Sequence, residues 1–517
     1  LSYRGCSGCS CRDETAAGLM ATTLASVARR PSAGRFAAPR RVAFLLSALL
    51  LVVSFTLAAP LAVAVVYRES QVVGAFATTL FAGVALGAAG VFLLRCDLSS
   101  ISRREGFVVV AAGWAMICLL GSVPFVLSGA LDLVNAWFES TSGFTTTGVS
   151  VIAEPQELPR GILFWRSMSQ WLGGMGFVVL YVALFPLLGV GASRLYGAEV
   201  PGLEVVRLRP RISSSAGILW LLYLLISGVL LLLLLLGGMD LFSAACAMFA
   251  VLSTGGFTIT SEGVTAYGGA FVEWVHVVFM WICATSFSLH WAVISGRPGK
   301  LVRNPEWRFF TGTLVTLSLV VAVILWSSGD SSPGRALHEA VFTVVSMGTT
   351  TGLAIVDYEF WTPAAQFILL LLMFMGGCAG STAGGIKVVR IQLFLKQALM
   401  STLHTLHPGA VTAPHLADRP VSPQTMRSVS SFLGLFMLVF LAGTVAVSLV
   451  TGMDVLSSMS ASIGMLGSNG AGLEAVGPFD TYAAMPGAGK LLLTFLMVTG
   501  RLELYTVLIL FTASFWR

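Results

Sequence analysis

Four short polar turns, each bearing a glycine and set between long apolar segments, constrain the fold of this chain most strongly. The turns are residues 145–148 (Thr-Thr-Thr-Gly), 253–256 (Ser-Thr-Gly-Gly), 349–352 (Thr-Thr-Thr-Gly) and 467–470 (Gly-Ser-Asn-Gly). When their last glycines are aligned, the residues sixteen positions upstream are Asp132, Asp240, Ala336 and Asp454. The alignment predicts one unit of helix, short re-entrant helix, polar turn and second helix that occurs four times.

A polar turn at membrane depth is tolerated only where protein or a water-filled path surrounds it. Glycine permits backbone angles that let successive carbonyls face one side, and the aligned aspartates suit the N-caps of short helices. The third unit has Ala336, so we expect Ser331 or Ser332 to cap its helix. Glycine, serine and threonine in one such turn could instead serve close helix packing. Four aligned copies favour a ring of backbone carbonyls that replaces the water shell of a cation.

Composition places the chain in a membrane. It is 56% hydrophobic and 10% charged, with a mean hydropathy of +0.87, which excludes a soluble globular protein. An apolar run of about 20 residues can cross the ~30 Å hydrocarbon core. We predict ten crossings, near residues 42–66, 71–94, 107–130, 161–188, 215–237, 271–295, 308–327, 364–397, 427–451 and 487–512.

The expected architecture is all-α and polytopic, with four helix–pore-helix–helix repeats in fourfold pseudosymmetry and two extra N-terminal helices. We predict a disordered cytoplasmic N-terminus (1–40), two extra transmembrane helices (41–95), pore repeat 1 (105–190), pore repeat 2 (213–296), pore repeat 3 with a glycine-rich loop (306–400), a cytoplasmic loop (401–425) and pore repeat 4 (426–514).

The distribution of positive charge predicts the orientation. All but six of the 30 Lys and Arg residues fall before residue 42, in 95–104, 194–211, 297–308 and 387–427, or at the C-terminus. Cytoplasmic loops are enriched in Lys and Arg, so we expect both termini in the cytoplasm and all four turns on the outer side. The net charge of +6 follows from this topology and gives no reason to expect nucleic acid as a partner.

A glycine-rich stretch interrupts the predicted crossing at 364–397. It holds five glycines with a serine and a threonine: Gly376, Gly377, Gly380, Ser381, Thr382, Gly384 and Gly385. The spacing of Gly376, Gly380 and Gly384 also suits a packing face. Five glycines cost too much helix propensity for packing alone, so we expect a broken helix whose unwound centre lines a cavity.

Arg501 lies in the last predicted crossing, with apolar residues on both sides. An arginine at the bilayer centre costs at least ~2.5–3.5 kcal/mol, so such residues face an interior or a water path. We expect a role beside the pore. The alternative is a structural ion pair with a carboxylate such as Glu139, Glu339, Glu474 or Glu503, and the two interpretations are compatible.

The four polar turns resemble those of the Trk/Ktr/HKT superfamily of potassium transporters. Residues 376–387 and the sequence Gly-Arg-Leu-Glu at 500–503 narrow the resemblance to the TrkH/TrkG family, the membrane subunits of bacterial Trk uptake systems. The resemblance covers about residues 40–517. It implies that the glycine-rich stretch and Arg501 act as a gate below the filter. It also implies a homodimer with one pore per protomer and a cytosolic TrkA-type ring that binds nucleotides.

The resemblance also implies which residues bind potassium. The expected filter positions are Thr146, Thr147, Gly148, Thr254, Gly255, Gly256, Thr350, Thr351, Gly352, Ser468, Asn469 and Gly470. Plant sodium-selective relatives carry serine at the first glycine, so Gly148 indicates potassium. The fourth turn departs from the simple Thr-Thr-Gly form, and the family is also irregular there.

The expected function is potassium uptake across the bacterial inner membrane, with no enzymatic activity, no cofactor and potassium as the substrate. The sequence leaves open a proton- or sodium-coupled symport and a sodium-dependent Ktr-type or less selective cation channel subunit. From another class, it leaves open a multi-span membrane enzyme or respiratory subunit. That alternative needs inward-facing His or carboxylate clusters, and the sequence does not display them.

Overall fold

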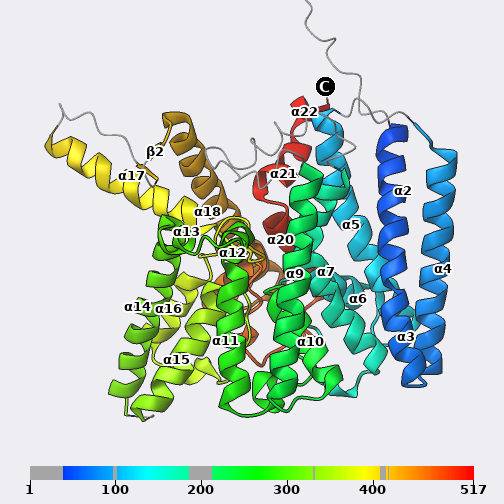
Figure 1. Ribbon diagram of the computed structural model, residues 1–517, viewed down its shortest axis with the longest axis horizontal. Coiled ribbons are helices and arrows are strands. Elements are labelled where there is room, and N and C mark those ends of the chain that lie inside the picture. The colour runs from blue at the N-terminus through cyan, green and yellow to red at the C-terminus, as the bar shows by residue number, and fades with distance from the viewer. Residues whose placement is uncertain are drawn as a thin grey trace, which may run out of the picture.

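The computed structural model describes residues 39–96, 102–184, 212–329, 332–407, 415–416 and 419–516. The predicted N-terminal segment 1–40 lies almost entirely outside these residues, and the basic loop 194–211 lies entirely outside them. The fold is mostly helical, and its long helices run side by side, with α2 and α4 at one edge (Figure 1).

The first half of the chain contains three N-terminal helices, the first two of which form one span, followed by two groups of helices. The N-terminal elements are α2 (Pro39–Thr56), α3 (Ala58–Val66) and α4 (Ser70–Leu93). Then come α5 (Arg103–Leu127), α6 (Leu133–Phe144), η1 (Pro155–Glu157) and α7 (Arg160–Leu184). They are followed by α9 (Ile212–Leu236), α10 (Leu241–Leu252), η3 (Gly263–Tyr267), α11 (Ala270–Ala284), α12 (Phe287–Ile294) and α13 (Gly299–Val302).

The second half has the same order of long helix, short helix, 3₁₀ turn and helix. Its first group is α14 (Pro305–Ser327), α15 (Pro333–Gly348), η4 (Tyr358–Phe360), α16 (Pro363–Leu372) and α17 (Val388–Leu406). A two-residue antiparallel pair, β1 (His415–Leu416) and β2 (Arg419–Pro420), follows. The last group is α18 (Pro423–Thr451), α19 (Val455–Leu466), η5 (Glu474–Val476), α20 (Gly487–Arg501), α21 (Leu504–Leu508), η6 (Ile509–Phe511) and α22 (Ala513–Trp516).

Six helices among the described residues are long and apolar enough to cross a membrane, or up to eight if each of two bent pairs is one span. These eight coincide with eight of the ten predicted crossings. The other two predictions fall on α7 and on the region of α16 and α17. Many leucines of the spanning helices are exposed, including Leu221, Leu225 and Leu232 on α9, which is the arrangement expected of a face in contact with lipid.

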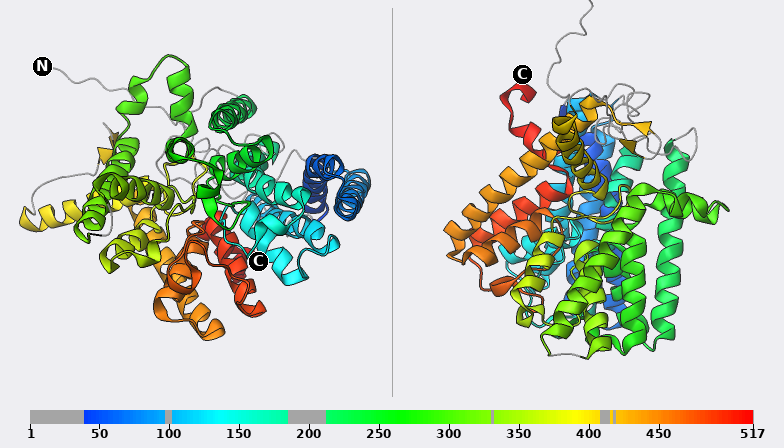
Figure 2. Two further views of the ribbon diagram at one scale, coloured as in Figure 1. Left: turned by 90° about the horizontal axis from the view of Figure 1, so that it is seen from below. Right: turned by 90° about the vertical axis from the view of Figure 1, so that its left-hand side faces the viewer.

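Two predicted crossings are bent rather than straight. Helix α12 is turned by 101° from α11 and extends sideways beyond the body with α13 (Figure 2). Helix α21 is turned by 116° from α20, at Glu503, whose φ is +59°. The crossings predicted at 271–295 and 487–512 therefore each contain a sharp bend. The apolar pattern gave no sign of these bends, because it carries no information on a local backbone break.

The aligned aspartates cap three of the four short helices, as predicted. Asp132 accepts a hydrogen bond from the N–H of Asn135, Asp240 from those of Phe242 and Ser243, and Asp454 from those of Leu456 and Ser457. Such caps satisfy backbone donors that have no partner inside the helix. The Ser457 side chain and these backbone donors also hold the pKa of Asp454 below its ordinary value.

The third short helix begins differently. Helix α15 starts at Pro333, three residues before Ala336, and its N-cap residue is Ser332. The Ser332 side chain makes no capping hydrogen bond, and Ser331 lies outside the described residues. A proline fits the first position of a helix because its fixed φ suits the first turn. Proline therefore starts this helix, and the prediction of a serine side-chain cap is wrong for Ser332.

Candidate functional site

The four polar turns share one backbone conformation. Their second residues, Thr146, Thr254, Thr350 and Ser468, have φ of 54°, 55°, 58° and 52°. Their last residues, Gly148, Gly256, Gly352 and Gly470, have φ of 86°, 78°, 75° and 67°. A positive φ costs a residue other than glycine of the order of 1–3 kcal/mol, and such strain clusters at functional sites. The three threonines and the serine at equivalent positions therefore make the turns the candidate functional site.

The turns meet each other in a closed cycle. A Cβ atom on the glycine of each turn would overlap the carbonyl oxygen that precedes the glycine of the next turn. The pairs are Gly148 with Gly255, Gly256 with Thr351, Gly352 with Asn469 and Gly470 with Thr147. The structure thus brings all four turns together, in chain order, at one place. Glycine is required at each contact because any side chain would enter the space of the neighbouring carbonyl.

The side-chain hydroxyls of the second residues of the four turns differ in their hydrogen-bond partners. The Thr254 hydroxyl donates to the carbonyl of Ser253 (2.6 Å), and the Thr350 hydroxyl accepts from the N–H of Gly384 (2.8 Å). The hydroxyls of Thr146 and Ser468 are buried and make no hydrogen bond among the described residues. Buried polar atoms without a partner are rare in proteins and point to a ligand, a solvent molecule or a functional role.

The four turns are held by hydrogen bonds from different side chains. Hydroxyl pairs join Thr145 to Thr147 and Thr349 to Thr351, each at 2.8 Å. In the fourth turn, Asn469 Nδ2 donates to the carbonyl of Met347 (3.0 Å), which lies in α15. In the second turn the contact comes from another element: Gln170 of α7 donates to the carbonyl of Gly255 (2.8 Å).

An ion pair lies one helical turn before Gln170 on α7. Arg166 Nε donates to Glu139 of α6 (2.6 Å), and Arg166 Nη1 donates to the carbonyl of Thr258 (2.6 Å). Glu139 also accepts from the N–H of Val151 (2.9 Å), and both charged side chains are buried. The network joins the segments that leave the first and second turns. Removal of one partner of a buried pair leaves an uncompensated charge, so this pair holds the two segments in place.

The helix predicted at 364–397 is broken, as expected, and the break is wider than the glycine-rich stretch. Helix α16 ends at Leu372 and α17 begins at Val388. The ends of the segment pair with each other, because the N–H of Gly376 donates to the carbonyl of Ile386 (2.9 Å) and the N–H of Val388 to that of Gly377 (3.2 Å). Gly380 and Gly385 have φ of 78° and 64°.

The backbone of this segment finds partners on several other elements. The N–H of Cys378 donates to the carbonyl of Ala284 (2.8 Å), and the carbonyl of Gly380 accepts from the N–H of Phe287 (3.1 Å). The N–H of Ala379 donates to the carboxylate of Glu306 (2.7 Å). Unpaired backbone groups are costly at membrane depth. The segment is therefore held by the break between α11 and α12 and by the start of α14.

The segment also touches the turns directly. Besides its bond to Thr350, Gly384 lies so close to the fourth turn that a Cβ would meet the carbonyl of Gly467 at 2.5 Å and the Cβ of Ser468 at 2.7 Å. Ser381 hydrogen-bonds only within the segment, to the carbonyl of Cys378 (2.6 Å). The predicted filter and gating residues are therefore adjacent, with Gly384 as the contact between them.

Arg501 connects the segment to α7. Its Nη1 donates to the carbonyl of Thr382 and its Nη2 to the carbonyl of Gly173, each at 3.1 Å. The alternative of an ion pair between Arg501 and Glu503 is wrong, because Glu503 pairs with Arg390 (2.8 Å). Glu139 and Glu339 pair with Arg166 and Arg335.

Sequence reasoning missed Gln170, Arg166 and Glu306 as parts of this site. A signal was present, since a polar or charged side chain inside an apolar helix is costly and faces the protein interior. What the sequence lacked was the partner of each. Gln170 and Gly255 are 85 residues apart, and Glu306 and Ala379 are 73 residues apart.

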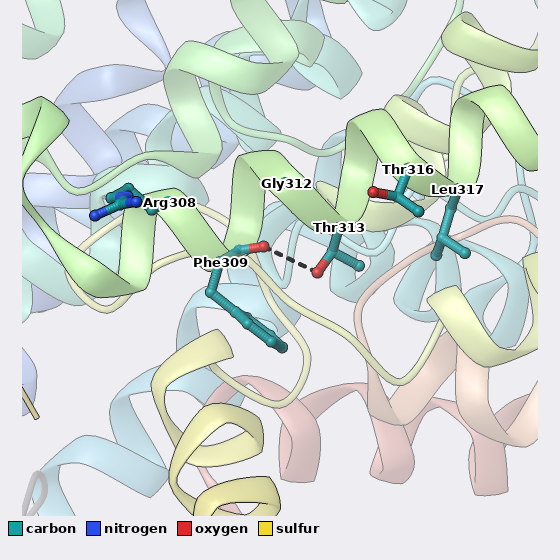
Figure 3. A pocket seen from close by; sticks show the side chains of 6 residues that line it. All are labelled: Arg308, Phe309, Gly312, Thr313, Thr316 and Leu317. Carbon is teal, nitrogen blue, oxygen red and sulfur yellow. Dashed lines mark hydrogen bonds between the residues drawn. The ribbon is translucent and has the colours of Figure 1, made fainter. Parts of the chain in front are cut away.

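A surface groove of about 370 Å³ lies elsewhere, on α14, lined by Arg308, Phe309, Gly312, Thr313, Thr316 and Leu317 (Figure 3). The Thr313 hydroxyl donates to the carbonyl of Phe309 (2.9 Å). None of the twelve turn positions lines this groove, so it is separate from the site.

Comparison with known proteins identifies the family of the chain. The sequence profile of the TrkH family, described as "Cation transport protein", matches residues 73–517. The chain belongs to the TrkH family. It is 36% identical to the Trk system potassium uptake protein TrkH of Escherichia coli K12, over 92% of this chain and 99% of that protein. It is 33% identical to TrkG of the same organism, over 90% and 96% of the two chains.

A solved member of the family has the same fold. The crystal structure of the potassium transporter TrkH from Vibrio parahaemolyticus superposes with a TM-score of 0.84 at 33% identity. The match covers 93% of this chain and 100% of that one. The predicted membership in the TrkH/TrkG family is confirmed, and the fold matches that of a transporter rather than an enzyme.

Proposed function

We propose that this protein is the membrane subunit of a potassium uptake system, with one cation pathway through the ring of four turns. The observation that carries the proposal is the closed cycle in which the glycine of each turn meets the carbonyl of the next. Backbone carbonyls arranged in a ring can replace the hydration shell of an ion. The names of the relatives, TrkH and TrkG potassium uptake proteins, support potassium as the substrate.

The proposed filter consists of the twelve predicted turn positions in fourfold pseudosymmetry. Similar φ angles at equivalent positions support this arrangement, and so does the recurring element order. The buried, unpaired hydroxyls of Thr146 and Ser468 suit the inner end of a path for ions or water. Each short helix points its C-terminal end, which carries a partial negative charge, at its turn, so the four helices favour a cation.

The proposed gate is the glycine-rich segment with Arg501. Its support is the direct contact of Gly384 with the third and fourth turns and the two hydrogen bonds of Arg501. We further propose a cytosolic TrkA-type regulatory subunit and a homodimer, as in the family. The membrane is the bacterial inner membrane, with both termini cytoplasmic. In support of this orientation, α2 begins and α22 ends at the same end of the molecule (Figure 1).

Two measurements test the function. Expression in a bacterium that lacks its own potassium uptake systems should restore growth at low potassium, and purified protein in liposomes should take up rubidium. Competition by potassium but not by an equal concentration of sodium is the expected result. Uptake that requires sodium would favour a sodium-dependent Ktr-type subunit. Absence of any monovalent cation flux from folded protein, with or without the regulatory subunit, would overturn the proposal.

A further inference from the structure

The second turn lacks the side chains that brace the first and third turns. In those turns the first and third residues are threonines whose hydroxyls hydrogen-bond to each other at 2.8 Å. The equivalent residues of the second turn are Ser253 and Gly255. The Ser253 hydroxyl bonds back to the carbonyl of Phe249 (2.7 Å) in its own helix, and Gly255 has no side chain. The second turn therefore has no brace of its own.

Gln170 of α7 occupies the space where that brace would be. A Cβ built on Gly255 would lie 2.6 Å from Cδ of Gln170 and 2.8 Å from its Nε2. The amide donates to the carbonyl of Gly255 (2.8 Å) and accepts from the N–H of Phe257 (3.1 Å). Gln170 is fully buried. One side chain thus holds both a turn carbonyl and the backbone just beyond the turn.

The position of Gln170 is set by the buried pair one turn earlier on the same helix. Arg166 holds Glu139 and the carbonyl of Thr258, and its guanidinium carbon lies 3.6 Å from the centre of the Phe257 ring. Arg166 and Gln170 therefore contact consecutive residues after the second turn, Thr258 and Phe257. The ion pair and the contact of Arg166 with Phe257 thus hold α7 against this segment independently of the two hydrogen bonds of the amide.

We propose that Gln170 is a positioning residue that sets the second turn of the filter and thereby the preference for potassium over sodium. It supplies from α7 the brace that threonine supplies within the first and third turns. The inference rests on the proposed function of the turns. Its physical basis is that the carbonyl of Gly255 also meets Gly148 of the first turn. A shift of this carbonyl therefore changes the spacing between two neighbouring turns.

Two single variants separate the donor from the bulk of the side chain. Gln170→Glu keeps the size and the acceptor for Phe257 but places a carboxylate oxygen against the carbonyl of Gly255. Gln170→Leu keeps the approximate volume and removes both hydrogen bonds. One hydrogen bond contributes about 1 kcal/mol, which corresponds to a factor of about five. We therefore expect the ratio of potassium to sodium flux to fall about fivefold in Gln170→Glu and further in Gln170→Leu, which loses both bonds. The matched control is Gln366→Leu, whose amide donates to the carbonyl of Glu359 in an outer loop.

A compensating pair provides the decisive test. Gln170→Ala should open the space beside position 255 and lower selectivity, and Gly255→Thr alone should lower it because the new side chain meets Gln170. The double variant Gln170→Ala, Gly255→Thr recreates the arrangement of the first and third turns. It should recover selectivity toward the wild-type ratio. Gly255 is not among the residues with positive φ, so threonine fits its backbone.

The measurements are rubidium and sodium flux into liposomes and the melting temperature of the same samples. An unchanged flux ratio in folded Gln170→Leu and Gln170→Glu would overturn the proposal. It would also be overturned if the double variant were no more selective than the worse single variant. If the leucine variant does not fold, the glutamate variant and the compensating pair give the answer. Failure of the proposed function itself would appear differently, as a wild type without potassium selectivity.

Discussion

At the scale of single residues, the packing of the four turns depends on the absence of a Cβ atom from each turn glycine, because a neighbouring carbonyl oxygen occupies that space. Gly148 has a φ of 86°, and any side chain there would overlap the carbonyl of Gly255. The position therefore combines a backbone requirement with a steric one. A substitution can fail for either reason, and the two reasons have different consequences for ion flux.

We predict that Gly148→Ser lowers the preference for potassium over sodium while the protein stays folded, because the new side chain displaces the carbonyl of the second turn. The control is Gly329→Ser, at a φ of 84° with no atom within 4 Å of the added Cβ. It carries the same backbone strain, of the order of 1–3 kcal/mol, without the overlap. Relative rubidium and sodium flux in liposomes measures the difference. Equal selectivity in the two variants would remove Gly148 from the filter.

In the proposed gate, Arg501 acts on the ion path through both its charge and its hydrogen bonds. A fixed positive charge repels a potassium ion by roughly 2 kcal/mol at ~8 Å and an effective dielectric of about 20. We predict that Arg501→Ala raises the uptake rate by about tenfold. Arg501→Lys should change it much less, since it keeps the charge but loses the two-point contact with Thr382 and Gly173.

Rubidium flux and melting temperature, measured on the same purified samples, decide the role of Arg501. Arg427→Ala, at an exposed position near the start of α18, is the control for loss of a cationic side chain. A destabilised Arg501→Ala protein that transports no faster than wild type would leave this arginine with a structural role only. A lysine variant as fast as the alanine variant would assign the effect to the hydrogen bonds rather than to the charge.

At the scale of secondary-structure elements, three interrupted helices meet, and hydrogen bonds between them pair backbone groups that the breaks leave free. The break between α11 and α12 offers the carbonyl of Ala284 and the N–H of Phe287 to the glycine-rich segment. The segment offers the carbonyl of Thr382 to Arg501, the last residue of α20 before the bend into α21. Each break frees backbone groups that would be costly alone at membrane depth. Movement of one element therefore changes the partners of the others.

Deletion of residues 378–383 should raise flux and weaken its dependence on the regulatory subunit. The deletion removes the contacts with Ala284, Glu306 and Arg501. It leaves four glycines to connect Met375 with Ile386, which already form a bridge. Rubidium flux with and without the regulatory subunit measures the effect. Ser381→Ala loses a bond within the segment and leaves the contacts of the segment with other elements in place, so a smaller effect is expected from it than from the deletion. A folded deletion variant with wild-type flux would exclude the segment as the gate.

At the scale of the whole molecule, loops from separate parts of the chain meet beyond the turns. Glu359, in the loop after the third turn, lies close to Gly477 of the loop after the fourth. Burial, together with the charges of Asp357, Asp480 and Glu474, raises the pKa of Glu359 to about 7. One of its oxygens is buried and has no hydrogen-bond partner among the described residues. The contact between the two loops is therefore sensitive to the charge on one carboxyl group.

The contribution of Glu359 to the stability of the folded protein should fall as the pH rises from about 4.5 to about 7. A group whose pKa is raised in the folded state contributes stability below its unfolded pKa, and the contribution is lost as the pH passes the folded pKa. For Glu359 this window extends from about 4.5 to about 7. We predict that Glu359→Gln flattens the pH dependence of the melting temperature in this window, with Glu262→Gln, at an exposed position, as control. Parallel curves for wild type and Glu359→Gln would contradict the assignment.

Local patterns in the sequence were sufficient for several parts of the fold. Apolar runs identified the six long helices and the two bent pairs that can cross a membrane, because crossing the hydrocarbon core requires length and composition rather than a partner. The aspartates at 132, 240 and 454 cap their helices through atoms two or three residues away. Five glycines within ten residues each cost up to about 1 kcal/mol of helix propensity, which indicated the break between α16 and α17. The polar turns were recognised because the same short pattern occurs four times.

Only the tertiary structure decided which distant groups meet. Arg501 donates to a carbonyl 328 residues away rather than to the nearby Glu503, since a bend in the backbone turns the glutamate toward Arg390. Gln170 fills the space that Gly255 leaves open, and no spacing in the sequence connects these two residues. Composition and local spacing determine what must lie in the membrane and where helices begin or break. The partner of each buried polar group depends on packing among elements far apart in the chain.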